Sequence, residues 1–195
     1  MAESTTIQNF FNIATTNQFS RDFLFRVKDI ALIGGLEFKG NKDLLYAKTA
    51  ALPGRTIENK NVNYFGQEFQ VPGKATYGNA TGYSIDFYHD ERCKIRSKFE
   101  EASRAVFAGP TGDQTESTGA YGMPGNESYI ILEQIDKGLN PVQEIKLVGA
   151  SIRDIGEIAY IIAEGTGEIL NYTVTFAYHW YEMTKPKASR AGLRD

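Results

Sequence analysis

The stretch YTVTFAYHW, residues 172–180, alternates large apolar side chains with smaller or polar ones. Successive side chains of a β-strand point to opposite faces, so the tyrosines, valine, phenylalanine and tryptophan share one face, and the threonines, alanine and histidine share the other. An aromatic face of this kind also suits stacking against a glycan, but alternation with polar residues is more typical of a strand that packs on a core. The stretch therefore predicts one long strand, half-buried in a sheet.

Strand patterns recur along the rest of the chain. The segment 56–71 is typical of a hairpin whose arms meet near Gly66, because strand-like residues flank a glycine that permits a tight turn. The other segments with a strand pattern are 23–27, 44–51, 83–89, 128–132, 143–149 and 158–163. Helices do not alternate with these strands as βαβ units require, so the pattern excludes a parallel-sheet fold and predicts about nine antiparallel strands.

One helix stands out after residue 90. The Asp90 carboxylate suits a helix start, and the apolar residues Ile95, Phe99, Ala102 and Val106 then fall on one helical face. We therefore expect a mainly β fold, an antiparallel β-sandwich or partly closed barrel with one packed α-helix.

The length of 195 residues fits a single domain. We expect this domain over 1–184, with an N-terminal extension 1–20 that carries a weak helical pattern, a long loop 108–128, and a basic flexible tail 185–195. There is no apolar run of about 18 residues and no secretion signal at the start, which predicts no membrane insertion and a cytoplasmic site of synthesis and assembly. The single cysteine, Cys93, fits a reducing compartment.

The net charge of −3 is unevenly distributed. Removing the four basic residues and one acid of the tail 185–195 from the 21 basic and 24 acidic residues of the whole chain leaves −6 for the rest. Proteins that grip nucleic acid neutralise phosphates with lysine and arginine, so this balance argues against tight DNA binding. It is compatible with a surface past which DNA slides.

The sequence contains no recognised motif of catalytic residues. His89 and His179 each lack a partner at metal-ligand spacing, and Cys93 lacks a sequence signature that pairs it with a histidine base. Neighbouring carboxylates, such as Asp86 with Asp90 or Asp154 with Glu157, are expected by chance among 24 acidic residues. The sequence predicts a protein without enzymatic activity, metal or cofactor.

Three blocks, in their order, resemble the tail tube family of contractile-tailed, T4-like bacteriophages. The first joins QFSR (18–21) and FLFRV (23–27) to AALPG (50–54), and the second joins YSIDFYHDE (83–91) to RSKF (96–99). The third consists of EIKLVG (144–149), IGEI (155–158) and the closing YTVTFAYHWYE (172–182). The chain departs from the family pattern at 32–43 and after residue 182.

The resemblance implies a structural subunit of the virion tail. Six copies would join sheet edges into a ring, and the rings would stack into a tube that a contractile sheath surrounds. The implied partners are further copies of the chain, the sheath protein, baseplate and tail terminator proteins, and viral DNA that passes without specific binding.

The same resemblance gives two sets of candidate residues. One face of the hairpin 56–71 would line the lumen while its other face rests on the subunit core, with Glu58, Lys60, Glu68 and Gln70 facing the channel. Candidate contacts between subunits or rings are Lys94, Arg96 and Lys98 of the helix and Asp113 and Glu116 of the long loop. A solvated helix face is the alternative interpretation of the three basic residues.

Other functions remain open at this point. A baseplate component that initiates the tube, a terminator, or the tube of a related contractile injection system would share these features. A glycan-binding β-sandwich is an alternative of another class, and a small hydrolase is a third.

Overall fold

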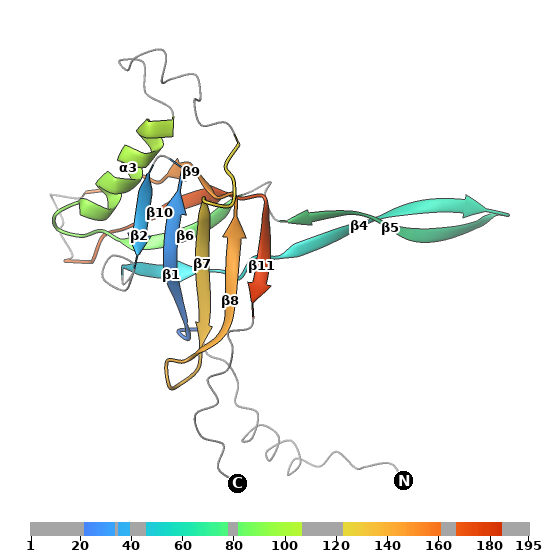
Figure 1. The fold of residues 1–195 in the computed structure, drawn as a ribbon, viewed down its shortest axis with the longest axis horizontal. Coiled ribbons are helices and arrows are strands. Elements are labelled where there is room, and N and C mark those ends of the chain that lie inside the picture. Colours follow the sequence, from blue (N-terminus) through green and yellow to red (C-terminus); the bar gives the residue numbers. More distant parts are fainter. Residues whose placement is uncertain are drawn as a thin grey trace, which may run out of the picture.

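The computed structural model describes residues 22–33, 35–39, 46–77, 82–106, 123–160 and 167–184. Within these ranges the chain forms eleven strands and one helix (Figure 1). In chain order they are β1 (Phe25–Leu32), β2 (Leu36–Lys39), β3 (Ala47–Ala50), β4 (Arg55–Tyr64), β5 (Gln67–Tyr77), β6 (Tyr83–Tyr88), α3 (Lys94–Val106), β7 (Tyr129–Ile135), β8 (Pro141–Val148), β9 (Ser151–Ile155), β10 (Asn171–Ala177) and β11 (Trp180–Thr184). The segment 1–20, most of the loop 108–128 and the tail 185–195 lie outside the described residues.

Two antiparallel sheets pack face to face. The first has the strand order β11-β8-β7-β1-β2, and the second has the order β3-β6-β10-β9. Strands β4 and β5 form a separate two-stranded hairpin, which extends away from both sheets (Figure 1). In the described part of the chain neither sheet closes on itself, so the fold is an open antiparallel sandwich, one of the two architectures that the strand patterns predicted.

The core lies between the two sheets and the helix. Every second residue of β6 and β10 points inward, which places Phe87 and Phe176 in the core with no exposed surface. Phe99 of α3 packs on both of these rings and on Phe38 of β2, with ring centroids 5.0 to 6.0 Å apart. The helix is therefore held to both sheets by one aromatic cluster.

The helix begins as the sequence predicted. The backbone N–H groups of Lys94 and Ile95 donate to the Asp90 carboxylate at 2.9 and 3.3 Å, which satisfies two donors that have no partner inside the helix. Ile95, Phe99 and Ala102 are buried, as the helical spacing requires.

The prediction of one strand over 172–180 was wrong, because the chain turns a corner there. Ala177 pairs with Ser151 in the four-stranded sheet, whereas Trp180 pairs with Val148 in the five-stranded sheet. Strands β10 and β11 thus belong to different sheets. Trp180 begins the second of them and is 39% exposed, so it is not a core residue.

A glycine makes this corner possible. Gly149 has a φ of +68°, and a Cβ atom built on it would lie 2.1 Å from Cδ2 of His179. Since real Cβ atoms are not found at such distances, only glycine fits between the end of β8 and the corner residue.

The structure differs from the expected strands in three further places. Phe23 precedes β1 and is 64% exposed, and a register shift after Val27 interrupts the expected alternation. Of the strand expected at 158–163, residues 158–160 are outside any strand and 161–163 lie outside the described residues, while a strand that was not expected, β9, precedes them. The short strand β2, which pairs with β1, was not predicted.

Candidate assembly surfaces

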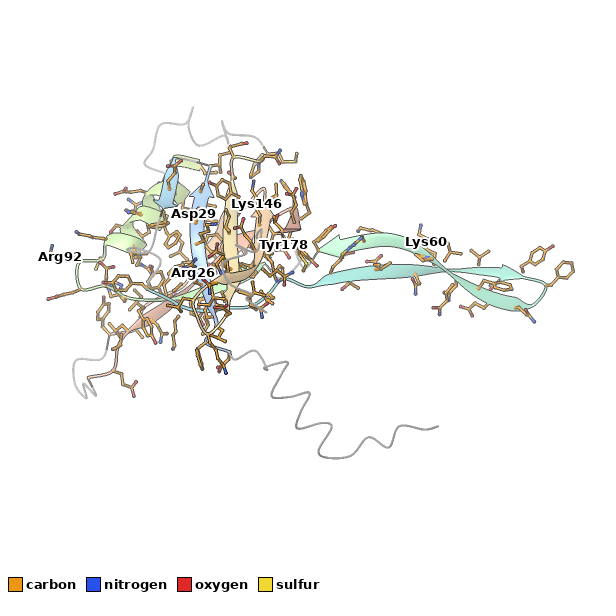
Figure 2. All side chains as sticks on the ribbon, turned by 60° about the horizontal axis from the view of Figure 1, so that its bottom comes forward. Arg26, Asp29, Lys60, Arg92, Lys146 and Tyr178 are labelled. Atoms are coloured by element: carbon orange, nitrogen blue, oxygen red, sulfur yellow. The ribbon has the colours of Figure 1, made fainter. Side chains whose placement is uncertain are left out.

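The hairpin of β4 and β5 projects from the sandwich (Figures 1 and 2). Every residue from Arg55 to Ala75 is exposed. At its base the Tyr77 ring packs edge-on against Tyr181, with centroids 5.3 Å apart, and the Arg55 guanidinium lies 5.5 Å from the Tyr77 ring. The expectation that one face of this hairpin rests on the core of its own subunit was therefore wrong.

The two faces of the hairpin differ in chemistry. Residues that pair across antiparallel strands share a face, and Val62 pairs with Phe69 while Asn61 pairs with Gln70. One face, which we call the apolar face, consists of Lys60, Val62, Tyr64, Gln67, Phe69 and Val71. The opposite polar face consists of Asn59, Asn61, Asn63, Glu68, Gln70 and Pro72. On the polar face the side-chain amide of Asn61 donates to the Glu68 carboxylate.

The four candidate lumen residues do not lie together. Lys60 pairs with Val71 on the apolar face, and Glu58 shares that side because it precedes Lys60 by two residues. Glu68 and Gln70 belong to the polar face. The structure thus places two of the predicted residues on each side, so they cannot line one channel wall from one face of this hairpin.

The tip of the hairpin has an unusual residue. Phe65 and Gly66 both have positive φ angles, 49° and 74°. Tight hairpin turns demand such angles, and asparagine or glycine adopts them more easily than a bulky side chain. The Phe65 ring is 88% exposed and packs edge-on against Tyr64, with centroids 4.6 Å apart. A strained backbone position therefore presents a large aromatic ring to solvent.

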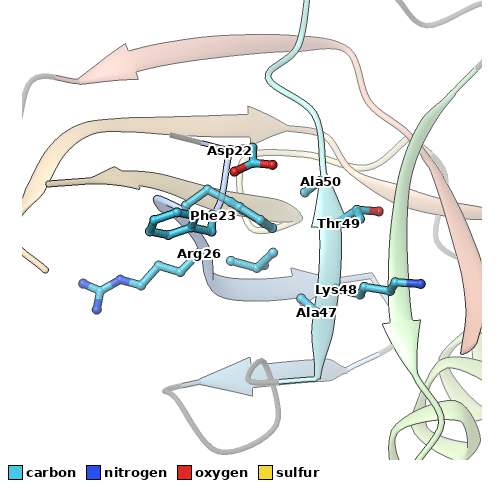
Figure 3. A pocket seen from close by; sticks show the side chains of 9 residues that line it. Asp22, Phe23, Arg26, Ala47, Lys48, Thr49 and Ala50 are labelled. Atoms are coloured by element: carbon cyan, nitrogen blue, oxygen red, sulfur yellow. The ribbon is translucent and has the colours of Figure 1, made fainter. Parts of the chain in front are cut away.

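A pocket of about 610 Å³ opens between the start of β1 and β3 (Figure 3). The backbone of β3 crosses β1 here, and the small side chains Ala47 and Ala50 leave space beside Phe25. The remaining lining residues are Asp22, Phe23, Arg26, Val27, Lys48 and Thr49. The pocket combines apolar walls with charged side chains.

A buried carboxylate lies on the outer face of the five-stranded sheet. Glu133 of β7 is 3% exposed, and its carboxylate contacts Arg26 at 2.5 Å and Lys28 at 2.9 Å. Lys28 also contacts Glu144 at 2.8 Å. Burial opposes ionisation of Glu133, but the hydrogen bonds from Lys28 and Arg26 outweigh it and hold its pKa below the ordinary value. Sequence reasoning missed this cluster, because its members are far apart in the chain.

The basic residues of α3 have contacts within the subunit. Arg96 donates to the backbone carbonyl of Gly156 at 2.6 Å, pairs with Glu100 at 3.1 Å, and lies 5.4 Å from the Tyr172 ring. These contacts tie the helix to the chain after β9, so Arg96 stabilises the fold whatever else it touches.

The structure describes two more of the predicted interface residues. Lys98 lies 4.7 Å above the Phe38 ring, and Lys94 is exposed at the first turn of the helix. Asp113 and Glu116 lie outside the described residues.

The sheets have open edges. Within the described ranges, β2 and β11 border the five-stranded sheet, and β3 and β9 border the four-stranded sheet. Each of these strands has a hydrogen-bonded sheet neighbour on one side only. Unpaired edges of this kind are templates for pairing with another chain.

Four of the residues weighed for catalysis have contacts within the subunit. The Asp86 carboxylate accepts hydrogen bonds from the hydroxyls of Thr49 and Thr173, and Asp90 caps the helix. His89 contacts the Tyr160 hydroxyl at 3.0 Å and the Cys93 sulfur at 3.4 Å. Among the described residues, no group of three or more His, Cys, Asp and Glu side chains is placed to hold a metal ion.

No helix within the described ranges is both long and apolar enough to cross a membrane.

Comparison with known proteins relates the fold to contractile machines. No family model and no curated protein matches the sequence. A chain of the anti-feeding prophage (AFP) baseplate, solved with six-fold symmetrisation, matches 87% of this chain over 98% of its own length, with a TM-score of 0.58 and 11% identity. A chain of the PVC extracellular contractile injection system, from its sheath–tube complex in the extended state, matches 94% of this chain over its full length, with a TM-score of 0.51 and 11% identity.

These matches confirm the tail-tube resemblance at the level of the fold. The chain has the fold of components of contractile injection systems, and the likeness extends over nearly all of both compared chains.

Proposed function

We propose that this protein is a structural subunit of the tube of a contractile tail, and that copies of it form stacked rings around a channel. The observation that carries the proposal is the projecting hairpin, whose apolar side chains Val62, Tyr64, Phe65, Phe69 and Val71 are 48 to 88% exposed. A free subunit gains nothing from exposing these side chains. They become buried if a second subunit covers them, and burial of apolar area is the main favourable term in association.

The sheet edges support closure into a ring. Edge strands β3 and β9 belong to one sheet, and pairing each with a neighbouring copy would remove the free edges of that sheet. Six copies per ring is the number we propose, since the AFP baseplate chain of like fold comes from a six-fold symmetrised assembly.

The further partners follow from this role. We propose a sheath protein outside the tube, baseplate and terminator proteins at its ends, and a location in the virion tail after assembly in the host cytoplasm. The cargo we propose is viral DNA that passes without specific binding, because the chain without its basic tail is acidic. The four candidate lumen residues remain a prediction about single positions, and only residues on one face of the hairpin can share a wall.

A second candidate is a baseplate component that starts the tube. The match with the AFP baseplate chain, at a TM-score of 0.58, favours this alternative. A tube subunit polymerises into long hollow tubes, whereas a baseplate component closes into single rings and stops.

Negative-stain electron microscopy and sedimentation velocity of the purified full-length protein test the proposal. Tubes support the tube subunit, isolated rings support the baseplate component, and a monomer at all concentrations that binds sugars would support the glycan-binding alternative and overturn the proposal. The double variant Val62→Ser with Phe69→Ser is expected to lose assembly, because it removes apolar area from the exposed face. The matched control, Asn61→Ser with Asn63→Ser on the polar face, is expected to assemble.

A further inference from the structure

We propose that the hairpin tip of one copy, Tyr64 and Phe65, inserts into the pocket between β1 and β3 of a second copy. This inference rests on the proposed function and names the surface that the hairpin contacts. The occupant to which it commits is a second copy of the same chain.

The tip has the properties of an inserted group. Phe65 holds a φ of 49°, in a region that bulky residues avoid because the backbone is strained there. Asparagine would make the same turn with less strain. The Phe65 ring is 88% exposed, so it does not stabilise its own subunit by burial. An apolar ring held in this way would be stabilised by burial against a partner.

The pocket has the properties of an acceptor. Its volume of about 610 Å³ falls within the range of about 300 to 1,000 Å³ typical of sites that enclose a small organic ligand. The walls Phe25, Val27, Ala47 and Ala50 are apolar, which suits an aromatic side chain. Figure 3 shows Phe23 and Arg26 on the same side of β3.

The tip of a copy cannot reach its own pocket. Strand β4 has 10 residues, and at about 3.3 Å per residue the hairpin carries its tip roughly 33 Å from its base. The hairpin runs away from the sandwich, while the pocket lies at the start of β1 (Figures 1 and 3). Tip and pocket are different surfaces of one chain, so a contact between them is head-to-tail, and such contacts generate rings or filaments.

Neither surface carries a net charge that opposes insertion of an aromatic ring. Residues 61–70 at the end of the hairpin carry one charged side chain, Glu68. The pocket is lined by Asp22, Arg26 and Lys48, and the Arg26 guanidinium is already paired with Glu133 at 2.5 Å. The charges of Asp22 and Lys48 balance each other, so the pocket can accept a nearly uncharged tip.

A cross-linking experiment tests the contact in assembled protein. Because Cys93 is the only cysteine, the background is Cys93→Ser, whose own assembly is checked by electron microscopy. Copies with Gln67→Cys beside the tip are mixed with copies carrying Ala50→Cys in the pocket, assembled, and treated with a short bismaleimide. We expect cross-linked dimers between the two variants.

The matched control replaces Ala50→Cys with Arg92→Cys, at the end of the sandwich opposite the hairpin (Figure 2), and is expected to give no dimers. Assembly without the Gln67–Ala50 cross-link, or with the Arg92 cross-link in its place, overturns this inference while the proposed function stands. If the Cys93→Ser protein and the unmodified protein both fail to assemble, the proposed function fails, and this inference with it.

The segment 1–21 adjoins Asp22 in the chain and is the competing occupant. A cross-link within one chain between Ala50→Cys and Phe11→Cys, in place of the cross-link between copies, would assign the pocket to that segment and overturn the inference.

Two variants of Phe65 separate insertion from turn formation. Phe65→Asn keeps the turn and lowers its strain, so the monomer is expected to be at least as stable as before. The critical concentration for assembly is expected to rise about 10- to 100-fold, because the buried ring is lost. Phe65→Tyr keeps a ring and is expected to assemble as the parent does. If Phe65→Asn assembles at the parent concentration, the inference is wrong.

Discussion

Replacing Phe99 with alanine removes the side chain on which the helix and both sheets converge. The ring has no exposed surface and packs on Phe38 of one sheet and on Phe87 and Phe176 of the other. A buried phenylalanine covers roughly 150 to 250 Å², and at about 25 cal/mol per Å² its burial contributes about 4 to 6 kcal/mol. An alanine side chain retains part of this burial energy, and the surrounding core relaxes little to fill the cavity. We therefore expect a loss of about 4 kcal/mol in the free energy of unfolding.

Urea unfolding followed by circular dichroism measures this loss. With an m-value of about 2 kcal/mol/M, the midpoint is expected to fall by about 2 M without a change in slope. The measurement uses protein concentrations below the assembly threshold, where the midpoint does not depend on concentration. Phe69→Ala, on the exposed hairpin, is the matched control and is expected to cost less than about 0.5 kcal/mol. A loss below about 1 kcal/mol for Phe99→Ala would refute the idea that this ring holds the helix and sheets together.

Three further predictions concern single groups. The lowered pKa of Glu133 means that its contribution to stability is present above its ordinary value of 4.5 and is lost as pH falls through the folded pKa. Glu133→Gln should therefore flatten the acid side of a stability–pH curve, and an unchanged slope would contradict the stabilisation of the Glu133 carboxylate by Lys28 and Arg26. Asp90→Ala should cost about 1 kcal/mol in urea unfolding while Asp90→Ser restores most of it, because only the cap is lost. Burial raises the pKa of Tyr83 and Tyr172, so these phenols should resist ionisation near pH 10 in an ultraviolet titration, and the fold should lose stability above that pH. Titration of every tyrosine near pH 10 in the folded protein would contradict this.

The sequence was sufficient to predict the elements that depend on residues close together in the chain. Strand β6 follows from simple alternation, since Tyr83 and Phe87 face the core. The helix follows from Asp90 and the apolar spacing after it, and the hairpin turn follows from Gly66. The order of these elements also led to the correct fold class.

Features with causes far apart in the chain could not be predicted in this way. Alternation continues through residues 172–180, so the sequence does not reveal that Gly149 meets His179 and that the chain changes sheets there. Exposed apolar residues on the hairpin alternate as in a half-buried strand, so a core contact was expected where solvent is found. The burial of Glu133 depends on Arg26, 107 positions away in the chain.

The length of the hairpin relative to its narrow base gives it the mechanics of a lever. Its attachment includes the ring contact of Tyr77 with Tyr181, and a tilt of about 5° there would move a tip roughly 33 Å away by about 3 Å. Such a displacement is comparable to the thickness of an aromatic ring, so in the assembly we propose neighbouring copies need not hold a fixed separation for the tip to stay in its pocket. The proposed tube could then bend by tilting of the hairpins at their bases, without strain in the core of each sandwich.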